Sequence, residues 1–234
     1  MMQTMLDTLS RELPALGLQL EEAVKENLCA FGCAVVKQNE VMNLTAITEP
    51  DRVAKLHLLD SLTLLTVADL NGKSVIDVGC GAGFPGVPVK IACPGMKLTL
   101  LDSLGKRMNW LETVLPDLGV NAECVTARAE EAVATRREGY DFATSRAVAR
   151  LNILLELTAP YVKVGGAVLA MKGAAAKEEL AECDHAIRQL GLKLEEVREF
   201  PIDGTSHAVI VLRKVKPTPP KYPRRYAKIK QNPL

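Results

Sequence analysis

Hydrophobic and polar residues are arranged in two different ways along this chain. Over residues 1–70 the apolar positions mostly follow helical spacing, with a break at Leu13-Pro14. A second helical stripe follows that break and comprises Leu18, Leu20, Ala23, Val24, Leu28 and Phe31. Residues 39–48 are turn-like, and Thr48 is a candidate N-cap for a further helix. The first 70 residues are therefore predicted to be helical.

From residue 73 onward, short apolar runs of strand type alternate with helical segments, which is typical of a parallel sheet with helices on both faces. We expect strands at 74–78, 97–102, 121–126, 140–145 and 166–171, with helices at 86–92, 105–115, 128–136, 148–160 and 174–190. Two more runs, 194–201 and 207–214, predict a hairpin around Gly204. The predicted fold is α/β, with a mostly parallel sheet of seven strands that ends in an antiparallel hairpin.

Three regions follow from these patterns: a helical region at 1–70, an α/β domain at 71–215 and a tail at 216–234. Regular structure in the tail is expected to be precluded by Pro217, Pro219, Pro220 and Pro223. The chain has 29 Lys and Arg against 28 Asp and Glu, and eight of the basic residues but no acid lie within 213–234. This asymmetry, with Tyr222 and Tyr226 available to stack on bases, favours nucleic acid as a partner. A solvated tail that only aids solubility is the alternative.

Composition excludes several classes of protein. The apolar region 56–70 is interrupted by polar residues and cannot span a membrane, and no signal peptide is visible. Six cysteines without a Cys-x-x-Cys pair, together with three scattered histidines, predict reduced thiols and no metal site. A cytoplasmic protein without a membrane partner is expected.

The segment 75–86 carries the strongest functional signal. A strand-type run, Val-Ile-Asp-Val, leads directly into a turn with glycine at positions 79, 81 and 83. Such a turn lets the backbone approach a ligand closely and leaves N–H groups of the next helix facing it. In doubly wound α/β domains this is where an adenosine-containing cofactor binds.

The acidic residues around the turn bear on which cofactor binds. Asp77, before the first glycine, either anchors the turn or faces a cationic ligand group, and it suits the sulfonium of S-adenosylmethionine better than a pyrophosphate. Asp102 ends the next strand, where a ribose-binding carboxylate is expected. The terminal hairpin also favours S-adenosylmethionine, although Gly81–Gly86 satisfies a dinucleotide pattern as well. The candidate cofactor residues are Asp77, Gly79, Gly81, Gly83 and Asp102.

Charged residues at other strand ends are candidates for the chemistry. Glu130 is placed to accept from an adenine amino group or to interact with its helix dipole. Arg146 ends a strand of small and apolar residues, which packing does not explain, and Arg128 and Lys172 resemble it. On the helix before the sheet, His57, Asp60 and Ser61 share one face; they form either part of the site or a partly exposed surface pair.

Motifs that are absent from the strand ends limit which atoms could accept a methyl group. The fourth strand ends in Ser145-Arg146-Ala147, where enzymes that methylate exocyclic amines carry an Asn/Asp-Pro-Pro-aromatic corner. No Pro-Cys pair at a strand end provides a nucleophile for pyrimidine C5. Guanine N7 fits, because it has a lone pair and no proton to remove, so positioning and charge are sufficient.

Together these motifs resemble the bacterial 16S ribosomal RNA guanine-N7 methyltransferase family, formerly called glucose-inhibited division protein B. The resemblance covers nearly the whole chain. It rests on segments 42–47, 57–61, 77–86, 128–131, 145–147 and 221–224. The ending Gly-Phe-Pro-Gly at 83–86 is its most specific part.

The resemblance implies a class I, Rossmann-like enzyme that transfers a methyl group from S-adenosylmethionine to one guanine N7 of 16S ribosomal RNA or of a small-subunit precursor. It also implies cofactor contacts at Gly79, Phe84, Ala129, Glu130 and Arg146, and roles in activity or RNA contact for Asn43, His57, Arg128, Arg146 and Lys172. Some relatives carry an arginine where this chain has Ser206, so that contact is lost or is taken over by the tail. We expect a monomer. A small-molecule methyltransferase is the alternative.

Overall fold

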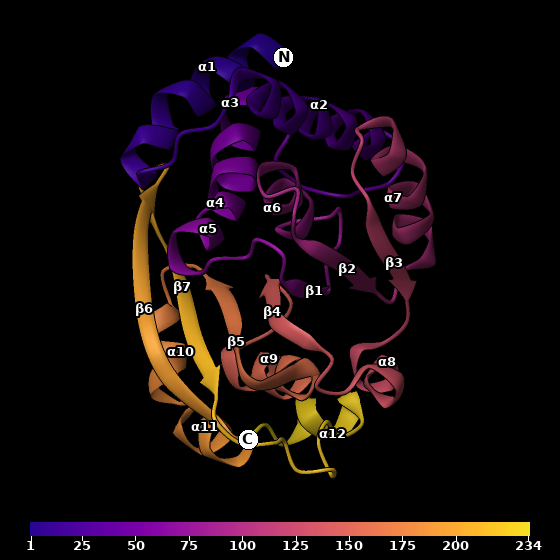
Figure 1. Cartoon of the computed structure of the whole chain (residues 1–234), viewed down its shortest axis with the longest axis vertical. Coiled ribbons are helices and arrows are strands. Elements are labelled where there is room, and N and C mark those ends of the chain that lie inside the picture. The colour runs from indigo at the N-terminus through magenta and orange to yellow at the C-terminus, as the bar shows by residue number, and fades with distance from the viewer.

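A seven-stranded sheet runs through the middle of the computed structural model, which describes residues 1–234 (Figure 1). The strand order is β3-β2-β1-β4-β5-β7-β6. The strands are β1 (Ser74–Val78), β2 (Lys97–Asp102), β3 (Ala122–Thr126), β4 (Tyr140–Arg146), β5 (Val162–Lys172), β6 (Leu192–Ile202) and β7 (Thr205–Lys214). The first five strands are parallel, whereas β7 is antiparallel to β5 and β6. The predicted mostly parallel sheet with a terminal hairpin is confirmed.

Helices cover both faces of this sheet. One hydrophobic core joins the N-terminal helices and α6–α7 to the first face, and a second joins α8–α11 to the other. The helices are α1 (Met2–Glu12), α2 (Glu22–Asn39), α3 (Pro50–Val53), α4 (Asp60–Leu62), α5 (Leu64–Val67), α6 (Gly86–Ala92), α7 (Gly105–Asp117), α8 (Ala129–Arg136), α9 (Leu151–Thr158), α10 (Ala176–Ala181), α11 (Asp184–Gln189) and α12 (Tyr226–Gln231). Short turns lie at η1 (Leu13–Leu16), η2 (Ala54–Leu59, a π-helix) and η3 (Ala159–Tyr161).

The strand order changes direction between β1 and β4, and this determines where a ligand binds. From β1 the sheet continues to β2 and β3 on one side and to β4 and β5 on the other. The connections that leave the carboxyl ends of β1 and β4 therefore diverge and open a crevice between them. The glycine turn follows β1, and Arg146 ends β4. The glycine turn and Arg146, both predicted to be functional, therefore lie at this crevice.

Three local expectations are wrong. The predicted helix over 174–190 is divided into α10 and α11 by a break at Glu182-Cys183. Helix α3 has Glu49 rather than Thr48 at its N-cap position, without a side-chain cap. The tail contains a helix, α12, between Pro223 and Pro233, because only proline positions themselves lack the N–H group that a helix needs.

Candidate active site

The glycine turn after β1 depends on the absence of side chains at two positions. Gly79 has φ +74°, and a Cβ there would lie 2.4 Å from Cγ2 of Val148. Gly83 has φ +96°, and its Cβ would contact Val87, Leu111 and Phe31 at 2.8–3.1 Å. Gly79 therefore lets the loop after β4 approach closely. Gly83 faces the hydrophobic core and does not line the cavity next to the turn, which corrects its expected place among the cofactor contacts.

Asp77 holds the turn from below. Its side chain is fully buried, and Oδ2 accepts a hydrogen bond of 2.8 Å from the N–H of Gly86, whereas Oδ1 has no partner. Burial raises the pKa of Asp77 to about 7. Because the carboxyl group lies beneath the turn and outside the cavity wall, the structure favours the anchoring role over direct contact with a cationic ligand.

A cavity of about 550 Å³ lies in the crevice above the turn. Residues from the carboxyl ends of β1, β2 and β4 and from the turn after β3 line it, which is the arrangement that binds ligands in open α/β sheets. Its wall includes most of the predicted cofactor residues, namely Gly79, Gly81, Phe84, Asp102, Ala129, Glu130 and Arg146. A Cβ at Gly81 would meet only Nη1 of Arg107 at 3.8 Å, so the backbone is open to the cavity there.

Asp102 fixes the shape of this wall and still faces the cavity. Its Oδ2 accepts from the N–H of Gly81 at 3.0 Å, and its Oδ1 accepts from the N–H of Leu104 at 2.9 Å. Each carboxylate oxygen has a second lone pair that is free to accept from a ligand hydroxyl. The glycine backbone and the acidic residues Asp102 and Glu130 thus fit an adenosine-containing, cationic cofactor such as S-adenosylmethionine.

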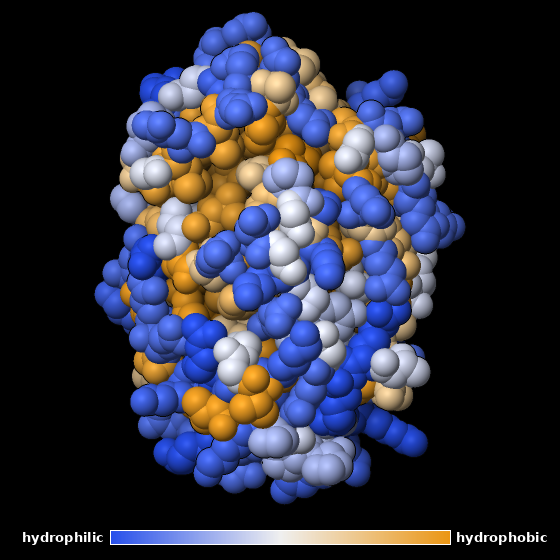
Figure 2. All heavy atoms as spheres, viewed as in Figure 1, coloured by the Kyte–Doolittle hydropathy of each residue, from blue (hydrophilic) through white to orange (hydrophobic).

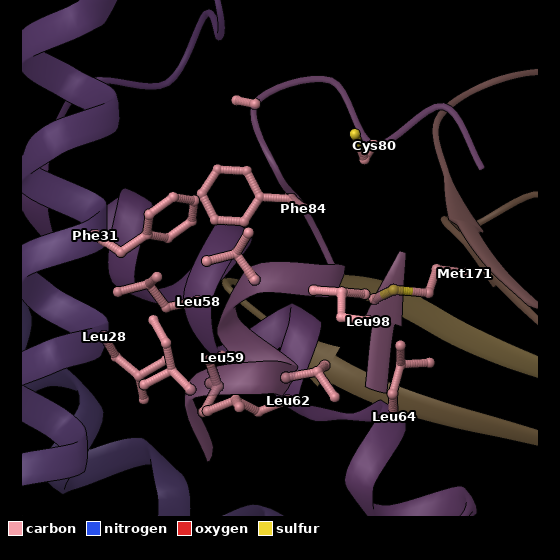
Figure 3. Close-up of a cluster of buried hydrophobic side chains, with 14 of the residues drawn as sticks. Leu28, Phe31, Leu58, Leu59, Leu62, Leu64, Cys80, Phe84, Leu98 and Met171 are labelled. Atoms are coloured by element: carbon pink, nitrogen blue, oxygen red, sulfur yellow. The ribbon is translucent and has the colours of Figure 1, made fainter. Parts of the chain in front are cut away.

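Arg146 is held rigidly in the cavity wall, beside Gly79 and Phe84. Its Nη1 donates to the carbonyl oxygen of Leu56 and to Oδ2 of Asp60, both at 2.8 Å. The guanidinium also lies 5.2 Å from the ring centroid of Phe84. Phe84 in turn contacts Phe31 of α2, with ring centroids 5.3 Å apart (Figure 3). The Gly-Phe-Pro-Gly motif thus connects the cavity to the N-terminal helices.

His57 completes one side of the Arg146 guanidinium. Its ring stacks on Phe84 at 4.7 Å, Nδ1 lies 3.2 Å from Nη2 of Arg146, and Nε2 lies 2.8 Å from Oγ1 of Thr45. Burial, reinforced by the charge of Arg146, lowers the pKa of His57 to about 4. Nδ1 thus lies between the guanidinium of Arg146, which only donates, and the carbonyl oxygen of Leu56 at 3.1 Å, which only accepts.

Asp60 links Arg146 to the terminal hairpin. Nδ1 of His207 donates to Oδ1 of Asp60 at 2.9 Å. Burial alone raises the pKa of Asp60, but the hydrogen bond from His207 and the charge of Arg146 hold it below its ordinary value. The hydrogen bond to Asp60 raises the pKa of His207. Asp60 is therefore buried and charged between two donors, and not part of an exposed His–Asp pair. Ser61 only bonds back to the carbonyl oxygen of His57.

A second cavity of about 650 Å³ adjoins the first. The two share His57, Arg146 and the loop residues Ala147 and Val148 as a common wall. Lys172 lines only the second cavity, where its Nζ contacts Oε2 of Glu179 at 2.8 Å and the carbonyl oxygen of Ala149 at 2.5 Å. Two ligands bound on either side of Arg146 would thus be adjacent, which is the geometry that direct group transfer requires.

The remaining predicted residues differ in their positions. Arg128 is exposed and lines the first cavity. Asn43 is exposed and lines neither cavity, although its neighbours Leu44 and Thr45 line the first. Ser206 is exposed. The neighbouring His207, and not Ser206, connects the hairpin to the site through its hydrogen bond with Asp60.

Several residues of the site were not predicted from the sequence, among them Thr45, Arg107, His207 and Tyr226. His207 and Tyr226 lie far along the chain from the glycine turn, and no local pattern connects them with it. Thr45 lies two residues after Asn43, in a segment on which the resemblance rests. That segment was the available signal for Thr45.

The basic tail is more ordered than expected, and fewer of its cations are free. Tyr222 is 5% exposed and cannot stack on bases. Lys214 is fully buried, Arg213 pairs with Glu195, and Arg224 pairs with Glu156. Tyr226 lines the first cavity. The tail therefore packs on the α/β domain as part of its structure.

Two further findings concern the whole described chain. No group of three or more His, Cys, Asp or Glu side chains is arranged to hold a metal ion, and all six cysteines are free. None of the helices has both the length and the apolar character that crossing a membrane requires.

Comparison with known proteins yields consistent matches. The family model GidB, described as rRNA small subunit methyltransferase G, matches residues 24–207. Ribosomal RNA small subunit methyltransferase G of Lactobacillus johnsonii is 42% identical over 96% of this chain and 98% of its own length, and that of Alkaliphilus metalliredigens is 44% identical over 90% of each. The crystal structure of M. jannaschii TYW2 in complex with AdoMet matches with a TM-score of 0.56 and 13% identity, covering 68% of this chain and 76% of that one. This last likeness concerns the fold alone.

Proposed function

The chain belongs to the rRNA small subunit methyltransferase G family, and on that premise we propose that it transfers a methyl group from S-adenosylmethionine to N7 of a guanine in 16S ribosomal RNA. The observation that carries this proposal is the pair of adjoining cavities with Arg146 in their common wall. The first suits the cofactor, and the second is open to the acceptor. A single chain supplies both, so we propose that it acts as a monomer, in the cytoplasm where its ribosomal substrate is.

The residues of the first cavity would hold the cofactor in three ways. The open backbone at Gly81 leaves room for its close approach, Asp102 accepts from ribose hydroxyls, and Glu130 accepts from the adenine amino group. When bound, S-adenosylmethionine supplies an electrophilic methyl group on a sulfonium. Phe84 and His57 present flat faces beside that position and exclude water from it.

Transfer to guanine N7 needs alignment more than acid–base help. The N7 lone pair forms the new C–N bond while the S–CH₃ bond breaks, so the positive charge moves from sulfur to the purine and no proton is removed. His57 is held neutral with a lowered pKa and is not required as a base. Arg146, fixed by Leu56 and Asp60, can donate to the guanine or to a phosphate from its remaining N–H groups.

Methyl transfer to small-subunit ribosomal RNA that lacks its N7 methyl groups tests this function. Labelled S-adenosylmethionine is incubated with the enzyme and with naked RNA or subunit particles, and the nucleosides are then separated. Label in 7-methylguanosine is the expected result. Label in another nucleoside would overturn the assignment to N7. Cofactor binding without any transfer to either form of RNA would favour a small-molecule acceptor.

A further inference from the structure

The C-terminal segment brings an aromatic side chain to the cofactor cavity. We propose that Tyr226 is a cofactor-contacting residue, and that RNA bound to the exposed cations of α12 tightens this contact. The second part rests on the proposed function. Tyr226 is half-buried at the start of α12 and lines the first cavity with Leu157 of α9 and the β3–α8 turn. An aromatic ring on such a wall can stack on the flat base of an adenosine group.

The path of the chain to Tyr226 is fixed by side chains that are otherwise costly to bury. Lys214 is 1% exposed, and its Nζ donates to the carbonyl oxygens of Ala159 and Val162 at 2.7 and 3.1 Å. The hydroxyl of Thr218 donates to the carbonyl oxygen of Leu190 at 3.0 Å. Arg137 of the α8–β4 connection donates to the carbonyl oxygen of Tyr222. The segment is therefore attached to the domain over its whole length.

One ion pair sets the position of Tyr226 directly. Glu156 of α9 is fully buried, and its carboxylate accepts from the backbone N–H of Arg224 at 2.8 Å and from Nη2 of the same residue at 2.6 Å. Tyr226 follows Arg224 by two residues, and Leu157, which lines the cavity, follows Glu156 by one. The clamp thus joins the α12 segment to the cavity wall next to the position of the aromatic ring.

Exposed cations on and beside α12 are available to bind an anion. Ile229 is fully buried, whereas Arg225, Lys228 and Lys230 are exposed and form no ion pair. Hydrophilic residues dominate the part of the surface in Figure 2 where Figure 1 places α8 and α12. Three free cations on one short helix match the phosphates of RNA. Phosphates bound there would hold α12 against α9 and keep Tyr226 at the cavity.

The coupling that follows is reciprocal. If RNA stabilises the position of Tyr226 that contacts the cofactor, the cofactor must increase RNA affinity by the same factor. Titration calorimetry measures S-adenosylmethionine affinity with and without a small-subunit RNA fragment. In the wild type we expect the RNA to increase that affinity several-fold. Equal affinities with and without RNA would overturn the coupling.

Substitutions at Tyr226 test the contact without RNA. Tyr226→Ala should weaken S-adenosylmethionine binding about tenfold, and Tyr226→Phe, which keeps the ring, should bind within about twofold of wild type. Equal melting temperatures establish that both variants are folded. Wild-type cofactor affinity in Tyr226→Ala, with or without weaker RNA binding, would overturn the proposed contact. Wild-type enzyme that does not bind the cofactor at all would instead overturn the proposed function.

A triple variant separates the RNA contact from the cofactor contact. Arg225→Ala/Lys228→Ala/Lys230→Ala should bind S-adenosylmethionine as wild type does when RNA is absent. Its RNA affinity should fall, the dependence of log affinity on log salt should become shallower by about 2, and RNA should no longer increase cofactor affinity. An unchanged salt dependence would overturn the role of α12 in RNA binding.

Discussion

Asp60 and His207, 147 residues apart in the chain, are joined by a hydrogen bond of 2.9 Å, and the other oxygen of Asp60 accepts from Arg146. The terminal hairpin thereby takes part in positioning the arginine between the two cavities. A buried carboxylate shared by two donors stays charged and holds both in one geometry. The position of Arg146 therefore depends on both the N-terminal region and the last strand.

Removal of the arginine tests its role in the common wall of the cavities. Arg146→Ala should lower kcat for methyl transfer by about 100-fold, because a fixed donor at the reacting centre is lost. Arg213→Ala, which removes a surface ion pair with Glu195, is the matched control and should retain wild-type kcat. Unchanged turnover in Arg146→Ala would remove the arginine from the mechanism.

His207 should make stability depend on pH in a defined direction. The pKa of His207 is raised in the folded protein by its hydrogen bond to Asp60, so its stabilising contribution is complete below the unfolded value near 6.5 and is lost as pH rises through the folded pKa. The difference in unfolding free energy between wild type and His207→Gln should therefore be largest near pH 6 and should shrink toward pH 8.

Urea denaturation at several pH values measures this difference. The exposed His185 provides the control variant His185→Gln. A His207→Gln difference that grows with pH would contradict the ion pair with Asp60.

Ionisation of Asp77 should lower the stability of the folded protein as pH rises. Because burial raises its pKa to about 7, the folded state holds a proton that the unfolded state has lost above pH 4, and the charge destabilises the fold as pH rises. Asp77→Asn removes this dependence. The variant should therefore gain stability relative to wild type between pH 5 and 8, by at most about 4 kcal/mol.

The same denaturation series checks this prediction, with Asp69→Asn as a control at an exposed position. A stability difference that is constant with pH would mean that Asp77 is already charged at pH 5. Asp77→Ala should be less stable than Asp77→Asn at every pH, because it also leaves the N–H of Gly86 without its acceptor.

The clamp between Glu156 and Arg224 should contribute strongly to stability. Arg224→Ala leaves a fully buried carboxylate without its cation, which costs about 3–5 kcal/mol, whereas the neighbouring Arg225→Ala, at an exposed position, should change stability by less than about 0.5 kcal/mol. The double variant Glu156→Gln/Arg224→Ala should recover part of the loss. Equal effects of the two single arginine variants would mean that the tail is not held by this pair.

Local signals in the sequence were sufficient for the sheet and for the cofactor turn. The strand Val75–Val78 is apolar on both faces, apart from Asp77, and glycines follow it, so neither depends on distant residues to be recognised. Arg146 could be identified from its own strand in the same way. A cation there has no packing partner on its own strand.

The partners of these residues were not predictable in the same way. His207 reaches Asp60 only because β7 lies next to β5, and the strand order is a property of the whole sheet. The tail was expected to be irregular from its prolines, yet Tyr222 is buried and Arg224 finds Glu156 on another helix. Composition describes the charge of a segment but does not reveal which acids in the fold neutralise it.

The position of Tyr226 in the cofactor cavity has a consequence for synthesis on the ribosome. Chains fold from the N-terminus as they emerge, and Tyr226 follows all seven strands of the sheet along the chain. The sheet and the glycine turn are therefore synthesised before this residue. The cavity wall is the last part of the site to close.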